Sequence, residues 1–130
     1  ETRPGSTITL GTALPRSPEF STTVAAEYTF FDAFSGAGDL SFRGEVVHTG
    51  EFYFDINEPA STYETARTLV NARIGYRPAN GDWEVAVWGK NLTDEAYRSF
   101  GRTSLANRIA LTQVGEPLSF GITLTRTWGR

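Results

Sequence analysis

Apolar and polar side chains alternate at a period of two along most of this 130-residue chain. The pattern is clearest near the C-terminus, where Leu118, Phe120, Ile122 and Leu124 alternate with small or hydroxylated residues. A period of two puts successive side chains on opposite faces of a strand, whereas an amphipathic helix repeats about every 3.6 residues. No sustained stripe at helical spacing is present. The alternation therefore predicts an all-β fold.

We expect an antiparallel meander of about five strands, at about residues 19–31, 38–54, 63–77, 82–97 and 116–129. Residues 1–18 precede the first strand as a loop segment, and residues 98–114 form a second long loop. Asn80-Gly81 lies between two alternating runs and is a strong signal for a tight hairpin. The connections between the strands are thus alternately short and long.

Composition limits the classes of partner and site. The formal net charge is −3, and Lys90 is the only lysine among twelve basic residues, so we expect no nucleic-acid partner. Cysteine is absent, which excludes disulfides and thiolate metal sites. No run approaches the ~18 apolar residues of a spanning helix, and no signal peptide is recognisable. Methionine is missing even at position 1, which predicts a processed chain or a fragment.

The aromatic residues of the apolar face gather at one end of the predicted strands. Tyr28 and Phe30 end the first strand, Tyr76 ends the third, Trp83 begins the fourth and Trp128 ends the fifth. Smaller aliphatic side chains occupy the middle of the strands. An aromatic belt beside an aliphatic band is typical of the lipid-facing surface of an outer-membrane β-barrel, because amphipathic rings favour the headgroup level. We expect these five residues at a membrane interface.

Three segments resemble TonB-dependent outer-membrane receptors. Trp88–Tyr97 (WGKNLTDEAY) is similar to a strand and turn near the C-terminus of that family, and Leu14–Tyr28 (LPRSPEFSTTVAAEY) to a segment that opens a descending strand. Gly115–Pro117 and the strand after it resemble the family's last strand, although Leu118 replaces the arginine that often follows Gly-x-Pro. The order and spacing of the three segments match over about residues 11–129.

The resemblance implies that the chain is the C-terminal part of a transmembrane β-barrel of roughly 22 strands. The plug domain, the other barrel strands and the segment that meets TonB would lie outside it. The implied location is the outer membrane of a Gram-negative bacterium, with lipid around the barrel. The implied function is import of a scarce nutrient complex, siderophore-bound iron foremost. Short turns would face the periplasm, and long loops, including residues 1–18, the exterior.

Charged side chains recur on the face opposite the aliphatic band. Pairing the predicted hairpins places Glu27 near Arg43 and Glu45 near Arg73, and Glu84 and Lys90 share this parity. One interpretation is a ladder of ion pairs along a barrel wall. The other is that these side chains line the path of a solute.

Ligand-binding candidates lie in the expected exterior loop. Arg98, Arg102 and Arg108 could contact an anionic ferric chelate or surface phosphates, because guanidinium groups bind such anions through paired N–H donors. They could equally be solvated loop residues.

Nothing in the sequence predicts catalysis, a metal site or a cofactor. His48 is the only histidine and has no second His or Cys partner. Asp94 and Glu95 point to opposite sides of a strand end, which disfavours acid–base catalysis. Asn91 begins an Asn-Leu-Thr glycosylation motif, which we interpret as incidental. We therefore expect a protein that is not an enzyme.

Two other functions remain open. The chain could be a soluble β-domain that binds a small ligand or a partner, which would stay in the aqueous phase during detergent partitioning. It could also be a small independent outer-membrane barrel with a structural or adhesin role, which a long reading frame upstream of Glu1 would exclude.

Overall fold

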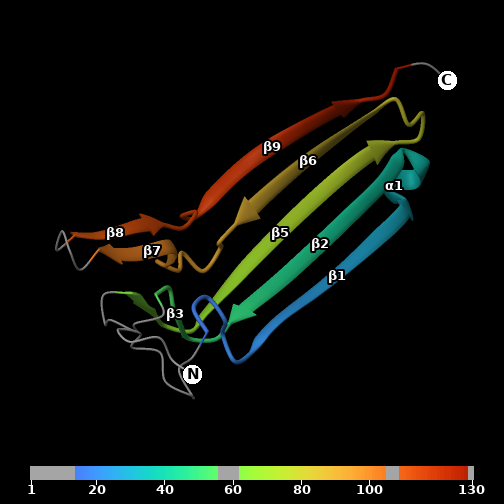
Figure 1. Cartoon of the computed structure of the whole chain (residues 1–130). Coiled ribbons are helices and arrows are strands. Elements are labelled where there is room, and N and C mark those ends of the chain that lie inside the picture. The colour runs from blue at the N-terminus through green and yellow to red at the C-terminus, as the bar shows by residue number, and fades with distance from the viewer. Residues whose placement is uncertain (1–13, 56–61, 105–108, 129–130) are drawn as a thin grey trace. The chain divides into compact units, whose positions relative to one another are not determined.

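The computed structural model describes residues 14–55, 62–104 and 109–128 (Figure 1). Its elements, in chain order, are β1 (Ser21–Asp32), α1 (Ala33–Gly36), β2 (Gly38–Thr49), β3 (Phe52–Tyr53), β4 (Tyr63–Glu64), β5 (Arg67–Pro78), β6 (Trp83–Lys90), β7 (Arg98–Ser104), β8 (Ile109–Val114) and β9 (Ser119–Arg126). Strands dominate the described residues, and the helical element α1 is a single turn. The all-β prediction is confirmed.

Five strands form one sheet in the order β1-β2-β5-β6-β9, and Figure 1 shows them side by side in that order. Pairing of β5 with β6 and of β6 with β9 is antiparallel. Short strands in the long connections make two separate ladders, β3 with β4 and β7 with β8. The predicted five-stranded antiparallel meander is therefore confirmed.

The chain divides into two compact units. The sheet unit comprises residues 23–47, 68–95 and 116–130, and the hairpin unit comprises residues 1–22, 48–67 and 96–115. The sheet unit holds most of the long strands. The hairpin unit holds the two short ladders and the strand ends that adjoin them. The two units are described separately below.

The register of the sheet assigns side chains to its two faces. Val87 lies directly opposite Ile74 on β5 and Ile122 on β9, so these three side chains share a face. We call it the apolar face; its exposed side chains also include Val24, Tyr28, Phe30, Phe42, Val46, Phe120 and Leu124. Trp88 lies opposite Arg73 and Gly121 and belongs to the polar face. Directly opposed residues point to the same side of a pleated sheet.

Tight turns close one end of the sheet unit. The backbone N–H of Gly81 donates to the carbonyl of Pro78 at 2.9 Å, and Gly81 has a φ of 69°. Glycine adopts this left-handed conformation without a steric penalty. The predicted Asn80-Gly81 hairpin is thus present between β5 and β6.

Two expected boundaries differ from the observed ones. The strand expected to reach residue 97 stops at Lys90, because Asn91 has a φ of 48° and turns the backbone away from the sheet. Residues 98–114, expected as a loop, contain β7 and β8, in which Arg102 pairs with Leu111. Residues of β8 pair with β7, and this pairing gives their backbone N–H and C=O groups hydrogen-bond partners that an irregular loop would not provide.

Very little of the sheet is buried within the chain. Among the described residues, only Phe54 and Ala86 are buried apolar side chains, and Ala86 is 1 % exposed. Ile122, in the middle of β9, is 74 % exposed. No helix among the described residues has the length and apolar character needed to cross a membrane. The apolar side chains of this sheet therefore face outward and not into an internal core.

Candidate functional site

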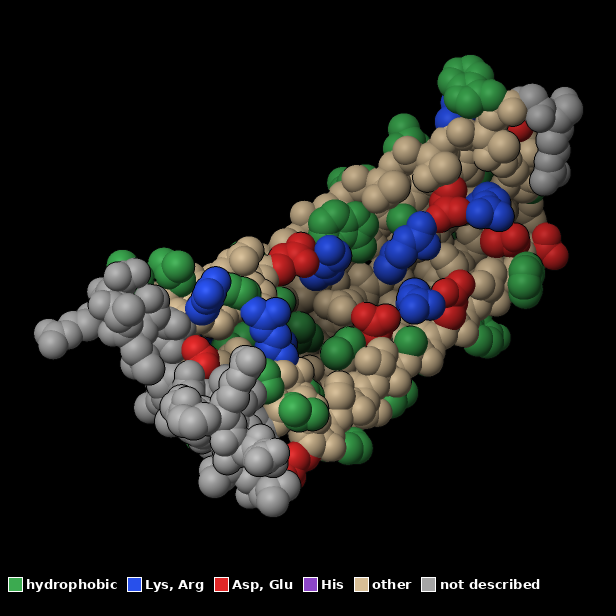
Figure 2. Space-filling view, in the orientation of Figure 1, with side chains coloured by type: hydrophobic (Ala, Val, Ile, Leu, Met, Phe, Trp, Pro, Cys, Tyr) green, Lys and Arg blue, Asp and Glu red, His purple; other side chains and the backbone are tan. Residues whose placement is uncertain are grey.

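The polar face of the sheet unit carries a series of acidic and basic side chains, which alternate in Figure 2. Arg43 Nη1 lies 3.4 Å from Glu27 Oε2 on the neighbouring strand, and Arg43 Nη2 lies 3.5 Å from Glu45 Oε2. Asn71 Nδ2 donates to Glu45 Oε1 at 3.0 Å. The predicted contact of Glu27 with Arg43 is present, and one continuous polar chain crosses β1, β2 and β5.

Arg73 does not form the predicted pair with Glu45. Its guanidinium bonds Glu84 Oε1 across the β5–β6 hairpin, and Arg77 Nη2 donates to Glu84 Oε2 at 2.7 Å. One carboxylate thus receives two guanidinium groups. The prediction was wrong because the short β5–β6 hairpin brings Glu84 within reach of both arginines.

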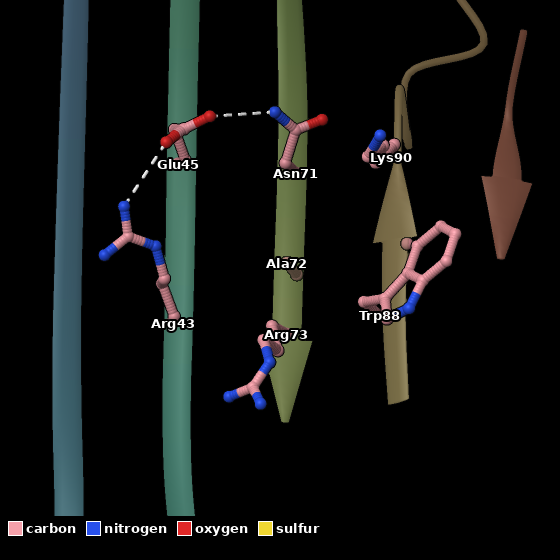
Figure 3. A pocket seen from close by; sticks show the side chains of 8 residues that line it. Arg43, Glu45, Asn71, Ala72, Arg73, Trp88 and Lys90 are labelled. Atoms are coloured by element: carbon pink, nitrogen blue, oxygen red, sulfur yellow. Dashed lines mark hydrogen bonds and ion pairs between the residues drawn. The ribbon is translucent and has the colours of Figure 1, made fainter. Parts of the chain in front are cut away.

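A pocket of about 320 Å³ opens on the polar face over β2, β5 and β6. Figure 3 shows its lining side chains, which come from three neighbouring strands: Arg43, Glu45, Asn71, Ala72, Arg73, Trp88, Gly89 and Lys90. Three of these residues are cationic, one is anionic and one presents an indole ring. Such a lining can contact an anionic group and an aromatic group together.

Trp88 is held in place by its neighbours on two sides. Its indole Nε1–H donates to Thr123 Oγ1 at 3.2 Å. A Cβ on Gly121, directly opposite, would lie 2.2 Å from Trp88 Cζ2, so the ring occupies the space that a side chain there would need. Lys90 Nζ lies 5.7 Å from the ring centroid and 3.2 Å from Glu116 Oε2. The pocket therefore has a fixed aromatic wall with a cation beside it.

Asn91 organises the turn that ends β6. Its side chain donates from Nδ2 to the carbonyls of Glu95 and Glu116, and its Oδ1 accepts the backbone N–H of Glu95 at 2.9 Å. Asn91 is only 2 % exposed. A buried and fully used amide cannot accept a glycan, which agrees with the incidental interpretation of the motif. The role of Asn91 is structural, and the motif alone did not reveal it.

In the hairpin unit, the candidate Arg98 is held by a buried carboxylate. Glu64 is 4 % exposed, and its Oε1 accepts the backbone N–H of Arg98 at 2.9 Å while its Oε2 accepts Arg98 Nε at 2.8 Å. Arg98 Nη2 also donates to the carbonyl of Tyr63. These contacts join β4 to β7 and make Arg98 a structural residue of this unit.

A second arginine, Arg67, lies beside the same carboxylate. Its Nη1 is 3.7 Å from Glu64 Oε1, and its guanidinium lies 4.5 Å from the Tyr97 ring centroid and 5.9 Å from that of Phe52. The Arg67 side chain is 15 % exposed. Sequence reasoning missed both Glu64 and Arg67, because no pattern links them to Tyr97 and Arg98 in the next long connection.

Tyr63 carries a shifted pKa in the same unit. Its hydroxyl donates to Glu51 Oε2 at 2.5 Å. This hydrogen bond, with smaller contributions from burial and from the negative charge of Glu51, raises the pKa of Tyr63 above its usual value. Ionisation would both lose the bond and place two negative charges together.

The remaining predicted residues are spread over the chain. Arg102 is exposed on β7, and Arg108 lies outside the described residues. His48 is half-buried with its ring 5.9 Å from that of Phe20. Within the described ranges, no group of three or more His, Cys, Asp or Glu side chains could hold a metal ion. The three candidate arginines therefore do not form one described site.

The five predicted interface aromatics lie near the short turns of the sheet unit. The Tyr28 and Phe30 ring centroids are 4.6 Å apart, and those of Tyr76 and Trp83 are 5.9 Å apart. Trp83 pairs with Arg126, and the Arg126 guanidinium lies 4.0 Å from the Trp128 ring centroid. Trp83 and Trp128 thus lie at the same end of the sheet.

The family model described as TonB dependent receptor-like, beta-barrel, matches residues 1–92. No curated protein and no solved structure gave a significant match. The family match covers β1, β2, β5 and β6, the strands that carry most of the polar face.

Proposed function

Because this chain belongs to the TonB-dependent receptor β-barrel family, we propose that its sheet forms part of the wall of an outer-membrane receptor that imports a scarce nutrient complex. The family is one of receptors and transporters and not of enzymes. The resemblance seen in the sequence is therefore confirmed at the level of the family. Location, solute and orientation are parts of the proposal.

The observation that carries the proposal is the exposed apolar face. Ile74, Val87 and Ile122 lie side by side across three strands, and each is exposed. Water disfavours such a surface by about 25 cal/mol for each Å², whereas lipid tails accept it without cost. A lipid environment explains why these side chains face outward.

The opposite face disfavours the soluble alternative. A soluble sheet would have to bury one face against a core. The polar face cannot serve, because its Glu27, Arg43, Arg73 and Glu84 side chains would lose water together, and desolvation of ion pairs costs more than their attraction returns. The apolar face has no covering element among the described residues.

The polar face supports an anionic cargo. Arg43, Arg73 and Lys90 line the pocket beside Trp88, and their guanidinium and ammonium groups suit the carboxylates or catecholates of a ferric siderophore. Iron is cargo in this proposal and not a resident cofactor. We propose siderophore-bound iron as the solute for this reason.

The remaining parts of the receptor follow from the family. In this proposal the other strands close the barrel, the plug fills it, and TonB supplies energy. The hairpin unit, which includes residues 1–18, faces the exterior. The strands span the membrane within residues 19–130, and Tyr28, Phe30, Tyr76, Trp83 and Trp128 lie at the periplasmic interface. An independent adhesin barrel is disfavoured because the matching family consists of receptors and transporters.

The absence of native cysteine allows a direct test of the two faces. Single cysteines replace Val87 or Ile122 on the apolar face, and Thr123 or Lys90 on the polar face. In lipid vesicles, a water-soluble maleimide should label the polar-face cysteines and spare the apolar-face ones. Equal labelling of both sets, or recovery of the chain in the aqueous phase of a detergent partition, would contradict the proposal.

The solute is tested separately by binding. A ferric tris-catecholate chelate should quench Trp88 fluorescence in the detergent-solubilised chain, and neutral cobalamin should not. Lys90→Gln should weaken the quenching, whereas Arg126→Gln, which removes a cation from the opposite, apolar face, serves as the matched control. Equal quenching by both probes would remove siderophore specificity while leaving the membrane assignment intact.

A further inference from the structure

A cleft lies at the short-turn end of the sheet unit, beside the aromatic residues. Asp82, Trp83, Leu124 and Arg126 line it, and its volume is about 460 Å³. This is within the range of pockets that hold small molecules, about 300–1,000 Å³. The cleft lies apart from the Trp88 pocket and shares none of its lining residues.

Arg126 is a cation on the apolar face. It lies directly opposite Trp83, and its position in β9 continues the series of Phe120, Ile122 and Leu124. Its guanidinium lies 4.0 Å from the Trp128 ring centroid. Among the described residues, the Arg126 guanidinium has neither a hydrogen-bond acceptor nor an ion-pair partner, so its N–H donors remain available.

Asp82 supplies the opposite charge at the same cleft. It is exposed and precedes β6, and its backbone carbonyl accepts the N–H of Thr127 at 2.9 Å, which ties the turn to the end of β9. Its carboxylate has no ion pair with any described residue. The cleft therefore presents one cation and one anion without an ion-pair partner among the described residues, and Trp83 of β6 and Leu124 of β9 complete its lining.

We propose that this cleft binds the headgroup of phosphatidylethanolamine. The Arg126 guanidinium would donate paired N–H bonds to the phosphate, and the Asp82 carboxylate would accept N–H bonds from the primary ammonium. Trp83 and Trp128 would flank the headgroup, and Leu124 would contact the start of an acyl chain. The inference rests on the proposed function, because it requires the apolar face to lie in lipid.

The charge pattern distinguishes this lipid from other phospholipids. Phosphatidylglycerol offers the phosphate but no cation for Asp82. Phosphatidylcholine offers a quaternary ammonium that has no N–H to donate. Only a headgroup with both a phosphate and a primary ammonium satisfies the two side chains at once.

The test measures lipid enrichment next to the tryptophans of the full chain in vesicles. The host is phosphatidylcholine, and a small fraction of brominated phosphatidylethanolamine, phosphatidylglycerol or phosphatidylcholine with matched acyl chains acts as the quencher. Trp88→Phe removes the polar-face signal, so emission reports Trp83 and Trp128. Brominated phosphatidylethanolamine should be enriched about threefold to tenfold over the other two, which corresponds to one charge-assisted contact at a wet interface.

Two variants and a control separate the headgroup site from membrane insertion. Arg126→Gln and Asp82→Asn should each abolish the enrichment, while Arg102→Gln should leave it unchanged. Quenching by brominated host lipid without preference for phosphatidylethanolamine, or a preference that survives Asp82→Asn, would overturn the headgroup site but keep the proposed function. Absence of quenching by any brominated lipid would overturn both.

Discussion

The sheet unit keeps its ion pairs on an open face, whereas the hairpin unit buries one. In the sheet unit, Arg43 and Glu27 are about half exposed, and water shares in solvating them. In the hairpin unit, Glu64 is nearly inaccessible and depends on Arg98 and Arg67 for its stability. Similar carboxylate–guanidinium pairs therefore contribute differently to the free energy of unfolding. An exposed pair contributes little, whereas removal of one partner of a buried pair leaves an uncompensated charge in the interior.

The substitution Glu64→Gln gives the strongest test of this difference between buried and exposed ion pairs. Removal of the buried negative charge leaves Arg98 and Arg67 without compensation and should lower the free energy of unfolding by about 3–5 kcal/mol. Glu116→Gln, which removes the exposed partner of Lys90, should cost about 0–1 kcal/mol and is the matched control. Urea unfolding of the complete receptor in lipid vesicles measures both. Equal costs would mean that burial does not distinguish the two pairs.

The next effect concerns the two faces of the sheet unit. Val87→Arg or Ile122→Arg should cost roughly 2–4 kcal/mol, because a cation would enter the middle of the apolar face, which the proposed function places in lipid. Thr123→Arg, on the polar face of the same strand as Ile122, should cost much less. A folding titration of the full-length barrel in vesicles measures the difference. Similar tolerance at both positions would reverse or remove the assignment of faces.

A smaller effect is expected at the wall of the Trp88 pocket. Gly121→Ala should cost about 1–3 kcal/mol, because the added Cβ overlaps the indole ring and forces it to move. Gly44→Ala on β2 is the control, since nothing lies within 4 Å of a Cβ there. Unfolding free energies and Trp88 emission should change together at Gly121 only. An unshifted emission spectrum in Gly121→Ala would show that the Trp88 ring does not pack against this glycine.

The smallest effect is a change in titration within the hairpin unit. The raised pKa of Tyr63 means that its neutral form is the one stabilised by folding. This contribution is fully present below the unfolded pKa of about 10 and is lost as pH rises through the folded value. Phenolate absorbance should show that Glu51→Gln lowers the pKa of Tyr63, with Tyr63→Phe identifying its signal. An unchanged titration would exclude Glu51 as the cause.

The sequence predicted contacts that short hairpins fix. Glu27 and Arg43 flank the tight β1–β2 connection, so counting from the turn gives their pairing correctly. Glu45 and Arg73 line the same pocket but form no ion pair, because Arg73 bonds Glu84 across the short β5–β6 hairpin while Glu45 bonds Asn71 and Arg43. Counting from a turn does not reveal such competing partners.

The contacts of the buried Glu64 with Arg67 and Arg98 could not be predicted from the sequence for a related reason. Glu64 and Arg98 are 34 positions apart and come from two different connections, with no periodicity to link them. Asn91 was visible as part of a motif, but its buried hydrogen bonds depend on carbonyls from a later segment, such as that of Glu116. Alternation reports which side a residue faces, and it carries no information on which loops meet.

The alternation of charge on the polar face also shapes the electrostatic potential along it. Glu27, Arg43 and Glu45 follow one another, and Glu84 lies between Arg73 and Arg77. A group that attracts an ionic solute is always next to a group of opposite charge that repels it. The electrostatic potential therefore changes sign along the face and stays small in magnitude. In the proposed receptor, such a surface would bind an ionic solute only weakly at each position, so that binding could be followed by release.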